Sequence, residues 1–366
     1  MMPGRWCRFT ICEGLEVFPV ARRWAMFVLR VVLVATVLLS GVTVRAADFK
    51  VVKQEDRGVK VMLAGETFTE YLVKSGHKPV LYPLIGSGGE ELTRRYPLQE
   101  AVETERSDHI HHRSFWFTHG DVNGIDFWGE SEKSGHILHR EFLQVRGGQT
   151  ALISTRNDWV DPAGETHCSD VRTLTFGADQ EHRWVDFDIT ITAARDVKFG
   201  DTKEGSFGVR LAGTMKVDAK LGGKILNSEG QTDKGAWGKA AKWVDYVGPV
   251  GEKTVGVAIL NHPSSFRFPT HWHVRTYGLF AANPFGLHHF YGDNSIDGGH
   301  TMKKGESFSL HYRVLLHQGD TAAGKVAEAF AEYAKTDRQV AMDAEQPARA
   351  RPLLGLVRRL FGRLGQ

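Results

Sequence analysis

Apolar and polar side chains alternate with a period of two over many short stretches of the chain, and this pattern predicts β-strands. In the clearest stretch, residues 184–193, four apolar side chains alternate with four polar ones: Val185, Phe187, Ile189 and Ile191 with Asp186, Asp188, Thr190 and Thr192. Residues 171–176 precede this stretch across a polar turn, so the two are predicted to form a hairpin. Similar patterns recur at residues 49–73, 206–215, 253–263, 273–280 and 307–318.

Strands at this spacing, with no helical pattern between them, favour an antiparallel sandwich over alternating β and α units. The 40 glycines and 9 tryptophans agree with β structure and many tight turns. One helix is predicted over residues 321–335, where Asp320 or Thr321 can cap the N-terminus and one stripe is apolar: Val326, Ala329, Phe330 and Tyr333. We therefore expect a mainly all-β chain, a large antiparallel β-sandwich with one helix near its C-terminus.

Residues 1–46 have the pattern of a signal peptide. An arginine pair at residues 22–23 precedes an apolar run over residues 31–42, and small side chains fit a cleavage site after Ala46. The residues before Met26 do not resemble the start of a signal peptide, whereas a start at Met26 would leave a compact one. We expect the protein to be exported, that is periplasmic, secreted or envelope-associated, with an uncleaved membrane anchor as the alternative.

The rest of the chain is expected to divide into three parts. Residues 47–336 are predicted to form a single sandwich domain, and residues 337–350 a polar, Pro- and Ala-rich linker. Residues 351–366 are predicted to form a helix with an apolar face and arginines largely away from it. Such a basic amphipathic helix can lie on an anionic membrane surface, so we expect either peripheral membrane contact or docking on the protein's own body.

Cysteine content and charge each limit what the chain can do. Cleavage after Ala46 would leave Cys168 as the only cysteine, which excludes an internal disulfide and favours a small buried thiol over a nucleophile. Residues 47–348 hold 35 Lys and Arg against 41 Asp and Glu, a formal charge of −6. We expect no basic face on such a body, and therefore no nucleic acid as partner.

Residues 107–130, SDHIHHRSFWFTHGDVNGIDFWGE, concentrate the candidate chemistry. If residues 109–119 form a strand, one face carries His109, His111, Arg113, Phe115, Phe117 and His119, and the other Ile110, His112, Ser114 and Trp116. Three histidines and an arginine on one face suit the floor of a cleft better than a dry interior, because buried polar groups need partners. An N-G turn follows, and then Asp126 and Trp128 at alternate positions place an acid beside an aromatic ring.

Two kinds of chemistry are open for these histidines. The H-x-H pairs His109/His111 and His271/His273 could supply ligands for Zn, Cu or Fe. Acid/base chemistry would instead pair a histidine with a carboxylate, and Glu204 follows a predicted strand in a loop with Asp201 and Lys203. Arginines such as Arg275 could hold a carboxylate or polarise a carbonyl, and tryptophan faces could stack on sugar rings. No G-x-S-x-G motif supports serine-based hydrolysis.

Five motifs together resemble one family. They are YPLIGSGGEELTRRYPL (82–98), DHIHHRSFWFTHGDVNGIDFWGE (108–130), FGDTKEGSFGVRLAG (199–213), WGKAAKWVDYVGP (237–249) and PTHWHVRTYGLFAANPFG (269–286). The chain resembles an exported bacterial family of unknown function that is often labelled "methane oxygenase PmoA", over about residues 50–320. A membrane methane oxygenase subunit spans the bilayer several times and this chain has one signal-like segment, so the label implies no methane chemistry. The resemblance does imply a carbohydrate role.

These observations predict an exported enzyme that acts on a small-molecule or oligosaccharide substrate by histidine/carboxylate acid/base chemistry, as in an epimerase, lyase or hydrolase. The sandwich is expected to be of the supersandwich or mutarotase-like type. The expected catalytic residues are His109, His112, Glu204 and His273. The expected substrate-binding residues are Arg113, His119, Asp126, Trp128, Lys203, Arg210, Trp272 and Arg275.

Two alternatives stay open. The first is a non-catalytic sugar-binding or cell-envelope module that uses the same cleft. The second is a metal-dependent oxidoreductase whose ligands would be His109, His111, His271 and His273. We favour no cofactor, and a divalent transition metal is the alternative.

Overall fold

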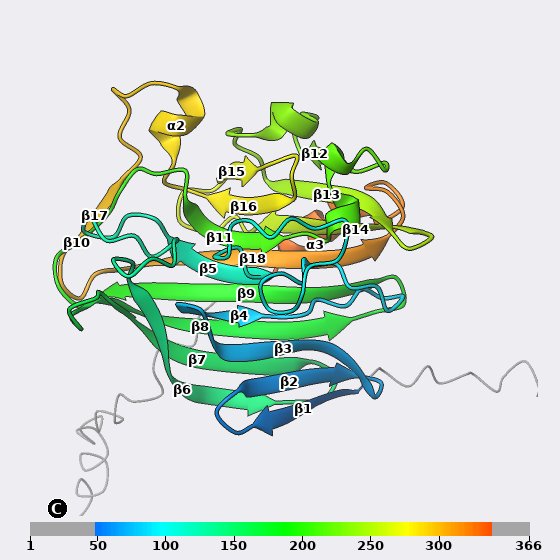
Figure 1. The fold of residues 1–366 in the computed structure, drawn as a ribbon, viewed down its shortest axis with the longest axis horizontal. Helices are drawn as coiled ribbons and strands as arrows, with labels where there is room; N and C mark the ends of the chain where they lie inside the picture. Colours follow the sequence, from blue (N-terminus) through cyan, green and yellow to red (C-terminus); the bar gives the residue numbers. More distant parts are fainter. Residues whose placement is uncertain (1–47, 339–366) are drawn as a thin grey trace, which may run out of the picture. The chain divides into compact units, whose positions relative to one another are not determined.

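The computed structural model describes residues 48–338 (Figure 1). The predicted signal peptide and the predicted helix over residues 351–366 lie outside the described residues. Two eight-stranded antiparallel sheets and one small strand pair make up the described part. The mainly all-β prediction is therefore confirmed.

The first sheet has the strand order β1-β2-β3-β4-β5-β11-β16-β15. Its strands are β1 (Phe49–Gln54), β2 (Gly58–Leu63), β3 (Glu66–Ser75), β4 (Lys78–Leu81), β5 (Phe115–His119), β11 (Gly205–Arg210), β16 (Leu279–Asn283) and β15 (His271–Val274). The predicted strand region 49–73 thus divides into three strands, β1 to β3, joined by tight turns.

The second sheet has the strand order β12-β13-β14-β18-β9-β8-β7-β6. Its strands are β12 (Lys224–Asn227), β13 (Trp243–Val250), β14 (Lys253–Asn261), β18 (Ser307–Gln318), β9 (His182–Ala193), β8 (Thr166–Ala178), β7 (Ala151–Val160) and β6 (His136–Arg146). The small pair is β10 (Val197–Phe199) with β17 (His300–Met302). The predicted hairpin is present as β8–β9, and Phe176 lies opposite Val185 in its register.

The hydrophobic core lies between the two sheets. The ring of Phe115 in β5 meets that of Phe187 in β9 edge-on at 5.7 Å, and Phe207 of β11 stacks on Tyr312 of β18 at 4.7 Å. Each side chain of this size contributes about 1.5–3 kcal/mol when it is fully buried. Cys168 is also in the core as a free thiol, as predicted.

Within residues 48–338, two α-helices accompany the sheets: α2 (Leu287–Tyr291), which was not predicted, and α3 (Val326–Tyr333). The predicted apolar stripe of α3 is confirmed, because it packs on Trp243, Leu260 and other residues of the second sheet. The helix begins five residues later than predicted. Asp320 accepts the N–H groups of Ala322 and Ala323 and so caps a separate turn, and Lys325 then adopts a left-handed φ of 47°.

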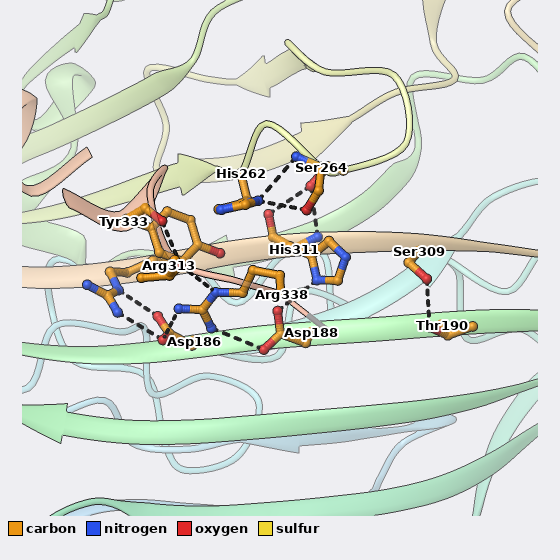
Figure 2. A network of polar contacts seen from close by, with 12 residues as sticks. Asp186, Asp188, Thr190, His262, Ser264, Ser309, His311, Arg313, Tyr333 and Arg338 are labelled. Carbon is orange, nitrogen blue, oxygen red and sulfur yellow. Dashed lines mark hydrogen bonds and ion pairs between the residues drawn. The ribbon is translucent and has the colours of Figure 1, made fainter. Parts of the chain in front are cut away.

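The polar face of β9 does not face solvent. Asp186 and Asp188 lie beneath α3 and the residues that follow it, where they pair with Arg313 and His311 of β18 (Figure 2). Ser264 bonds a different imidazole, His262. Because the acid and the serine contact different histidines, this cluster is not a Ser-His-Asp relay.

No helix within residues 48–338 is both long and apolar enough to cross a membrane.

Candidate active site

The candidate site is built on the face of the first sheet that turns away from the second sheet, which we call the outer face. Trp116 of β5, Arg210 of β11 and His273 of β15 project from it, because successive side chains of a strand point to opposite faces. Their neighbours on these strands lie in the core: Phe115, Phe117, Val209, Trp272 and Val274. Three strands therefore bring distant parts of the sequence to one surface.

A glycine makes room for the aromatic part of this face. Gly208 lies opposite Trp116 in the β5–β11 register. A Cβ atom at Gly208 would lie 2.6 Å from Cζ2 of Trp116, so the missing side chain lets the indole lie across β11. The His112 ring then stacks on Trp116 at 5.4 Å and 15°, and Trp128 packs edge-on against both.

The expected strand over residues 109–119 begins only at Phe115. Residues 109–112 form a turn instead, which we call the histidine turn, and His109 has a φ of 46° there. The turn brings its histidines together: His109 stacks on His112 at 4.8 Å and 5°, and His111 stands perpendicular to His112 at 4.5 Å. Buried Arg94 holds the turn, because it donates to the carbonyl oxygens of His109 and His112.

The tautomer of His112 follows from its partner. Nδ1 of His112 lies 2.9 Å from Nη1 of Arg210, and a guanidinium can only donate. Nδ1 therefore carries the lone pair, and the proton of the neutral ring is on Nε2. Burial, and then the charge of Arg210, hold the pKa of His112 well below its ordinary value. His112 is thus the fixed, neutral ring at the end of the histidine turn.

His273 has the opposite tautomer. Its Nδ1 lies 2.6 Å from the carbonyl oxygen of Lys203, so Nδ1 donates and the lone pair is on Nε2. Burial lowers the pKa of His273 to about 4. The ring is therefore neutral near pH 7 and can accept a proton at Nε2.

Glu204 lies near His273 and near His111 of the histidine turn, because both imidazoles act on its carboxyl. Its Oε1 is 2.5 Å from Nζ of Lys203. Burial raises the pKa of the Glu204 carboxyl. The hydrogen bond from Lys203 and the nearby His273 and His111 lower it by more, so the net shift is downward. Burial, together with the charge of Lys78, also lowers the pKa of His111 to about 4. Glu204 is thus an ionised carboxylate among neutral imidazoles.

A cavity of about 330 Å³ lies beside His273. Its lining residues are Lys234, Trp237, Val274, Arg275 and Thr276. Trp237 packs edge-on against His273 at 6.3 Å, and the Arg275 guanidinium lies 5.8 Å from the centre of the Trp237 ring. A volume of this size is within the range of small-molecule sites.

Three expected substrate-binding residues lie at the edge of the site and already bond or pack against other groups of the protein. Arg113 forms a bidentate ion pair with Glu130, and Glu130 also pairs with buried Lys78. Burial raises the pKa of Glu130, but its bonds to Arg113 and Lys78 bring it down to about 2. Asp126 accepts the N–H groups of Trp128 and Gly129, in the turn after the N-G pair, and Trp128 itself is buried.

Two expected substrate-binding residues lie on the wrong face of the sheet for contact with a ligand in this site. His119 is fully buried, with Nε2 2.9 Å from the carbonyl oxygen of Gly200. Trp272 is fully buried in the core, and its indole N–H donates to the carbonyl oxygen of Ala241. Both therefore support the site from behind.

The four histidines considered as metal ligands do not form a ligand group. Within residues 48–338, the group whose donor atoms all lie within 4.8 Å of one another is Asp201, His288 and His289. His271, by contrast, bonds the hydroxyl of Tyr291 at 3.1 Å and stacks on Phe290.

Sequence reasoning missed Tyr277. Its ring stacks on His109 at 5.9 Å and lies 4.8 Å from the guanidinium of Arg210 and 5.5 Å from that of Arg275. It therefore joins the histidine turn to the cavity. A signal for it was present, because Tyr277 continues a period of two through His271, His273 and Arg275.

Comparison with protein-family profiles gives a match over most of the chain. The profile of a family of unknown function (DUF6807) matches residues 58–331. A search of curated proteins finds no match for this chain.

The likeness to solved structures is distant. A glycoside hydrolase family 97 enzyme in complex with panose, from Pseudoalteromonas sp. strain K8, has 10% identity and a TM-score of 0.31, with 77% of this chain and 35% of that chain covered. The GH36 alpha-galactosidase AgaA from Geobacillus stearothermophilus has 9% identity and a TM-score of 0.34, with 75% and 40% covered. The chain thus spans well under half the length of either enzyme.

Proposed function

The chain belongs to the DUF6807 family, a family of unknown function, and we propose that it acts on a carbohydrate by proton transfer at the outer face. His273 is the base in this proposal, and Glu204 is the paired carboxylate. The observation that carries it is a neutral imidazole with its lone pair on Nε2 and an ionised carboxylate as electrostatic neighbour. Trp237, which packs against this imidazole, lines a cavity of about 330 Å³.

The protonation states favour proton abstraction over glycoside hydrolysis. Hydrolysis of a glycosidic bond uses a carboxylic acid of raised pKa to protonate the leaving oxygen. Glu204 has a lowered pKa and His273 a pKa of about 4, so both are unprotonated near pH 7. A lyase or an epimerase, which first removes a proton from carbon, fits this state better than a hydrolase.

The surrounding groups stabilise the base as it takes up the proton. Nδ1 of His273 keeps its bond to the carbonyl oxygen of Lys203, which fixes the ring. The negative charge of Glu204 favours the imidazolium that forms. His109 and His112 act as positioning residues here, because they stack on each other and, through Tyr277, hold the wall of the site.

The carbohydrate assignment rests on the aromatic and charged character of the site and on the family resemblance. A flat ring such as Trp237 can cover the apolar face of a sugar, and charged groups around it can bond the hydroxyls. We propose further that the protein acts after export, as its N-terminal pattern predicts. No step in this proposal draws on methane chemistry.

A single substitution can remove the proposed base and keep the hydrogen bond that orients it. His273→Asn keeps a side-chain N–H that can donate to the carbonyl oxygen of Lys203 and removes Nε2. The full chain should be incubated with neutral and acidic oligosaccharides in heavy water, and turnover or carbon-bound proton exchange followed by NMR. We expect His273→Asn and Glu204→Gln to lose about 100-fold or more of the rate.

His271→Asn is the matched control, since His271 lies on the same face of β15 but bonds the hydroxyl of Tyr291 instead of the carbonyl oxygen of Lys203. It should change the rate by no more than about 2-fold. A full rate in His273→Asn would refute the proposed base. Binding of saccharides without turnover or exchange by the unmodified protein would instead support a non-catalytic binding module.

A further inference from the structure

We propose that the cavity beside His273 binds a uronic acid unit of the substrate, with its carboxylate on the guanidinium of Arg275. This inference rests on the proposed function, because it names the substrate class of the same site. It goes beyond that function by requiring a carboxylate next to the carbon that loses its proton.

The charge of the cavity points to an anion. Its charged lining residues are Lys234 and Arg275, and both are cationic. The surrounding chain has the opposite sign, since residues 47–348 carry a formal charge of −6. A cavity whose lining is positive on a negatively charged body concentrates anionic ligands.

The guanidinium of Arg275 lies against two aromatic rings, and no acidic side chain in the described part of the chain pairs with it. Its guanidinium lies 5.8 Å from the ring centre of Trp237 and 5.5 Å from that of Tyr277. Within residues 48–338, no hydrogen bond or ion pair joins this guanidinium to another side chain. The other arginines of the outer face differ: Arg210 contacts Asp108 and Arg113 contacts Glu130.

The planar fork of a guanidinium matches the two oxygens of a carboxylate. Stacking on aromatic rings holds that plane and leaves the N–H groups at its edge available. The buried indole N–H of Trp237 is a further donor without an acceptor in the described part of the chain. These donors suit a ligand that carries acceptor oxygens and negative charge.

The position of Arg275 also suits the proposed chemistry. It follows His273 by two residues, so both side chains belong to the outer-face side of the chain as it leaves β15. In a uronic acid the C5–H bond is next to the carboxylate. When this bond breaks, the proton passes to Nε2 of His273, and the electron pair is delocalised into the carboxylate, where Arg275 balances the added charge.

The resulting enolate has two outcomes. It can regain a proton at C5, which gives exchange or inversion. Alternatively it expels the O4 substituent as the C4=C5 double bond forms, and the departing oxygen takes a proton from the ammonium group of Lys203. A neutral sugar without a carbonyl group has no C–H bond of comparable acidity, so two unprotonated groups would have little use on it.

The test uses the full chain and trisaccharides that differ in charge. The acidic probes are α-1,4-linked trigalacturonate, β-1,4-linked triglucuronate and β-1,4-linked trimannuronate. The uncharged probes are the methyl ester of trigalacturonate and cellotriose. Calorimetry measures binding, and NMR in heavy water measures loss of the C5–H signal.

We expect at least one acidic probe to bind about 10-fold or more tightly than the uncharged probes. Arg275→Met, which keeps most of the apolar stem, should remove this preference, and Arg275→Lys should restore part of it. Lys50→Met is the control: it removes one exposed positive charge from β1, at the opposite edge of the same sheet, and should change binding by less than about 2-fold.

The possible failures are distinguishable. If the uncharged probes bind as tightly as the acids and Arg275→Met changes neither, the uronate inference is overturned, whereas the proposed base still stands if His273→Asn abolishes loss of the C5–H signal from the methyl ester. If acids bind through Arg275 but C5–H never exchanges, the binding site is supported and the proposed base is refuted. If no probe binds, the uronate inference is overturned, and the His273→Asn experiment on other oligosaccharides decides the proposed base.

Discussion

Nη2 of Arg338 lies 2.8 Å from Oδ2 of Asp186, and Nη1 of the same residue lies 3.3 Å from Oδ2 of Asp188 (Figure 2). Both acids belong to the polar face of β9, and the Arg338 side chain is only 11% exposed. Arg313 of β18 binds Asp186 from the other side at 2.6 Å. Arg338 belongs to the segment predicted as a linker. Its two ion pairs therefore anchor the chain after α3 to the second sheet.

Arg338→Met should destabilise the protein by about 2 kcal/mol, because it removes a buried partner while Arg313 and His311 still pair with the two acids. Urea unfolding at neutral pH measures the change. Lys335→Met is the control, since Lys335 pairs with Glu332 on the surface, and it should cost no more than about 0.5 kcal/mol. Equal effects of the two substitutions would show that Arg338 does not pin this segment.

Gly208→Ala should disturb the outer face. The added Cβ atom would lie 2.6 Å from the Trp116 indole, so the ring must move and His112, which stacks on it, must move too. We expect a loss of about 1–3 kcal/mol and a changed near-ultraviolet circular dichroism signal. Gly235→Ala is the matched control, because nothing lies within 4 Å of its Cβ position. An unchanged spectrum in Gly208→Ala would contradict the packing described for Trp116.

The strands were predictable because their signal is local. Alternation identified β9 and β18 almost to the residue, and the N-G pair at residues 123–124 has positive φ at both positions, as its turn requires. Alternation also grouped Phe115, Phe117 and His119 on one face. It could not say that this face is the core, because that depends on which sheet packs behind it.

The site was less predictable because its decisive contacts are non-local. The histidine turn depends on a positive φ at His109 and on bonds from Arg94, which lies 15 residues earlier in the chain. The base at His273 depends on a carbonyl 70 residues away, at Lys203. Residue types indicated that His273 and Glu204 suit acid/base chemistry, whereas only the fold shows that Arg113 already has an acid to pair with.

His119 should make stability depend on pH. Burial lowers the pKa of its ring to about 4, against 6.5 for an ordinary histidine. Between these values the unfolded chain binds a proton that the folded chain does not, so stability is fully present above pH 6.5 and is lost as the pH falls towards 4. At pH 5 the loss from His119 alone should be about 2 kcal/mol relative to pH 7.

Urea unfolding of the unmodified protein and of His119→Gln at pH 7 and pH 5 measures this contribution. Gln can still donate a hydrogen bond to the carbonyl oxygen of Gly200, but it does not titrate. The variant should therefore lose less stability between the two pH values than the unmodified protein does. Equal losses would show that His119 does not carry this pH dependence.

Asp201 hydrogen-bonds both to α2 and to the loop that follows it, and we expect no metal ion to take part. Its Oδ2 accepts the backbone N–H groups of His288 at 3.0 Å and Gly298 at 2.5 Å, and its Oδ1 lies 2.8 Å from Nδ1 of His288.

Dialysis against a chelator should leave Tm within about 1 °C, whereas Asp201→Ala should cost about 2 kcal/mol, because both N–H groups lose their acceptor. Asp293→Ala, at an exposed surface turn, should cost no more than about 0.5 kcal/mol. A rise in Tm with Zn²⁺ that His289→Ala abolishes would show instead that the three residues coordinate an ion.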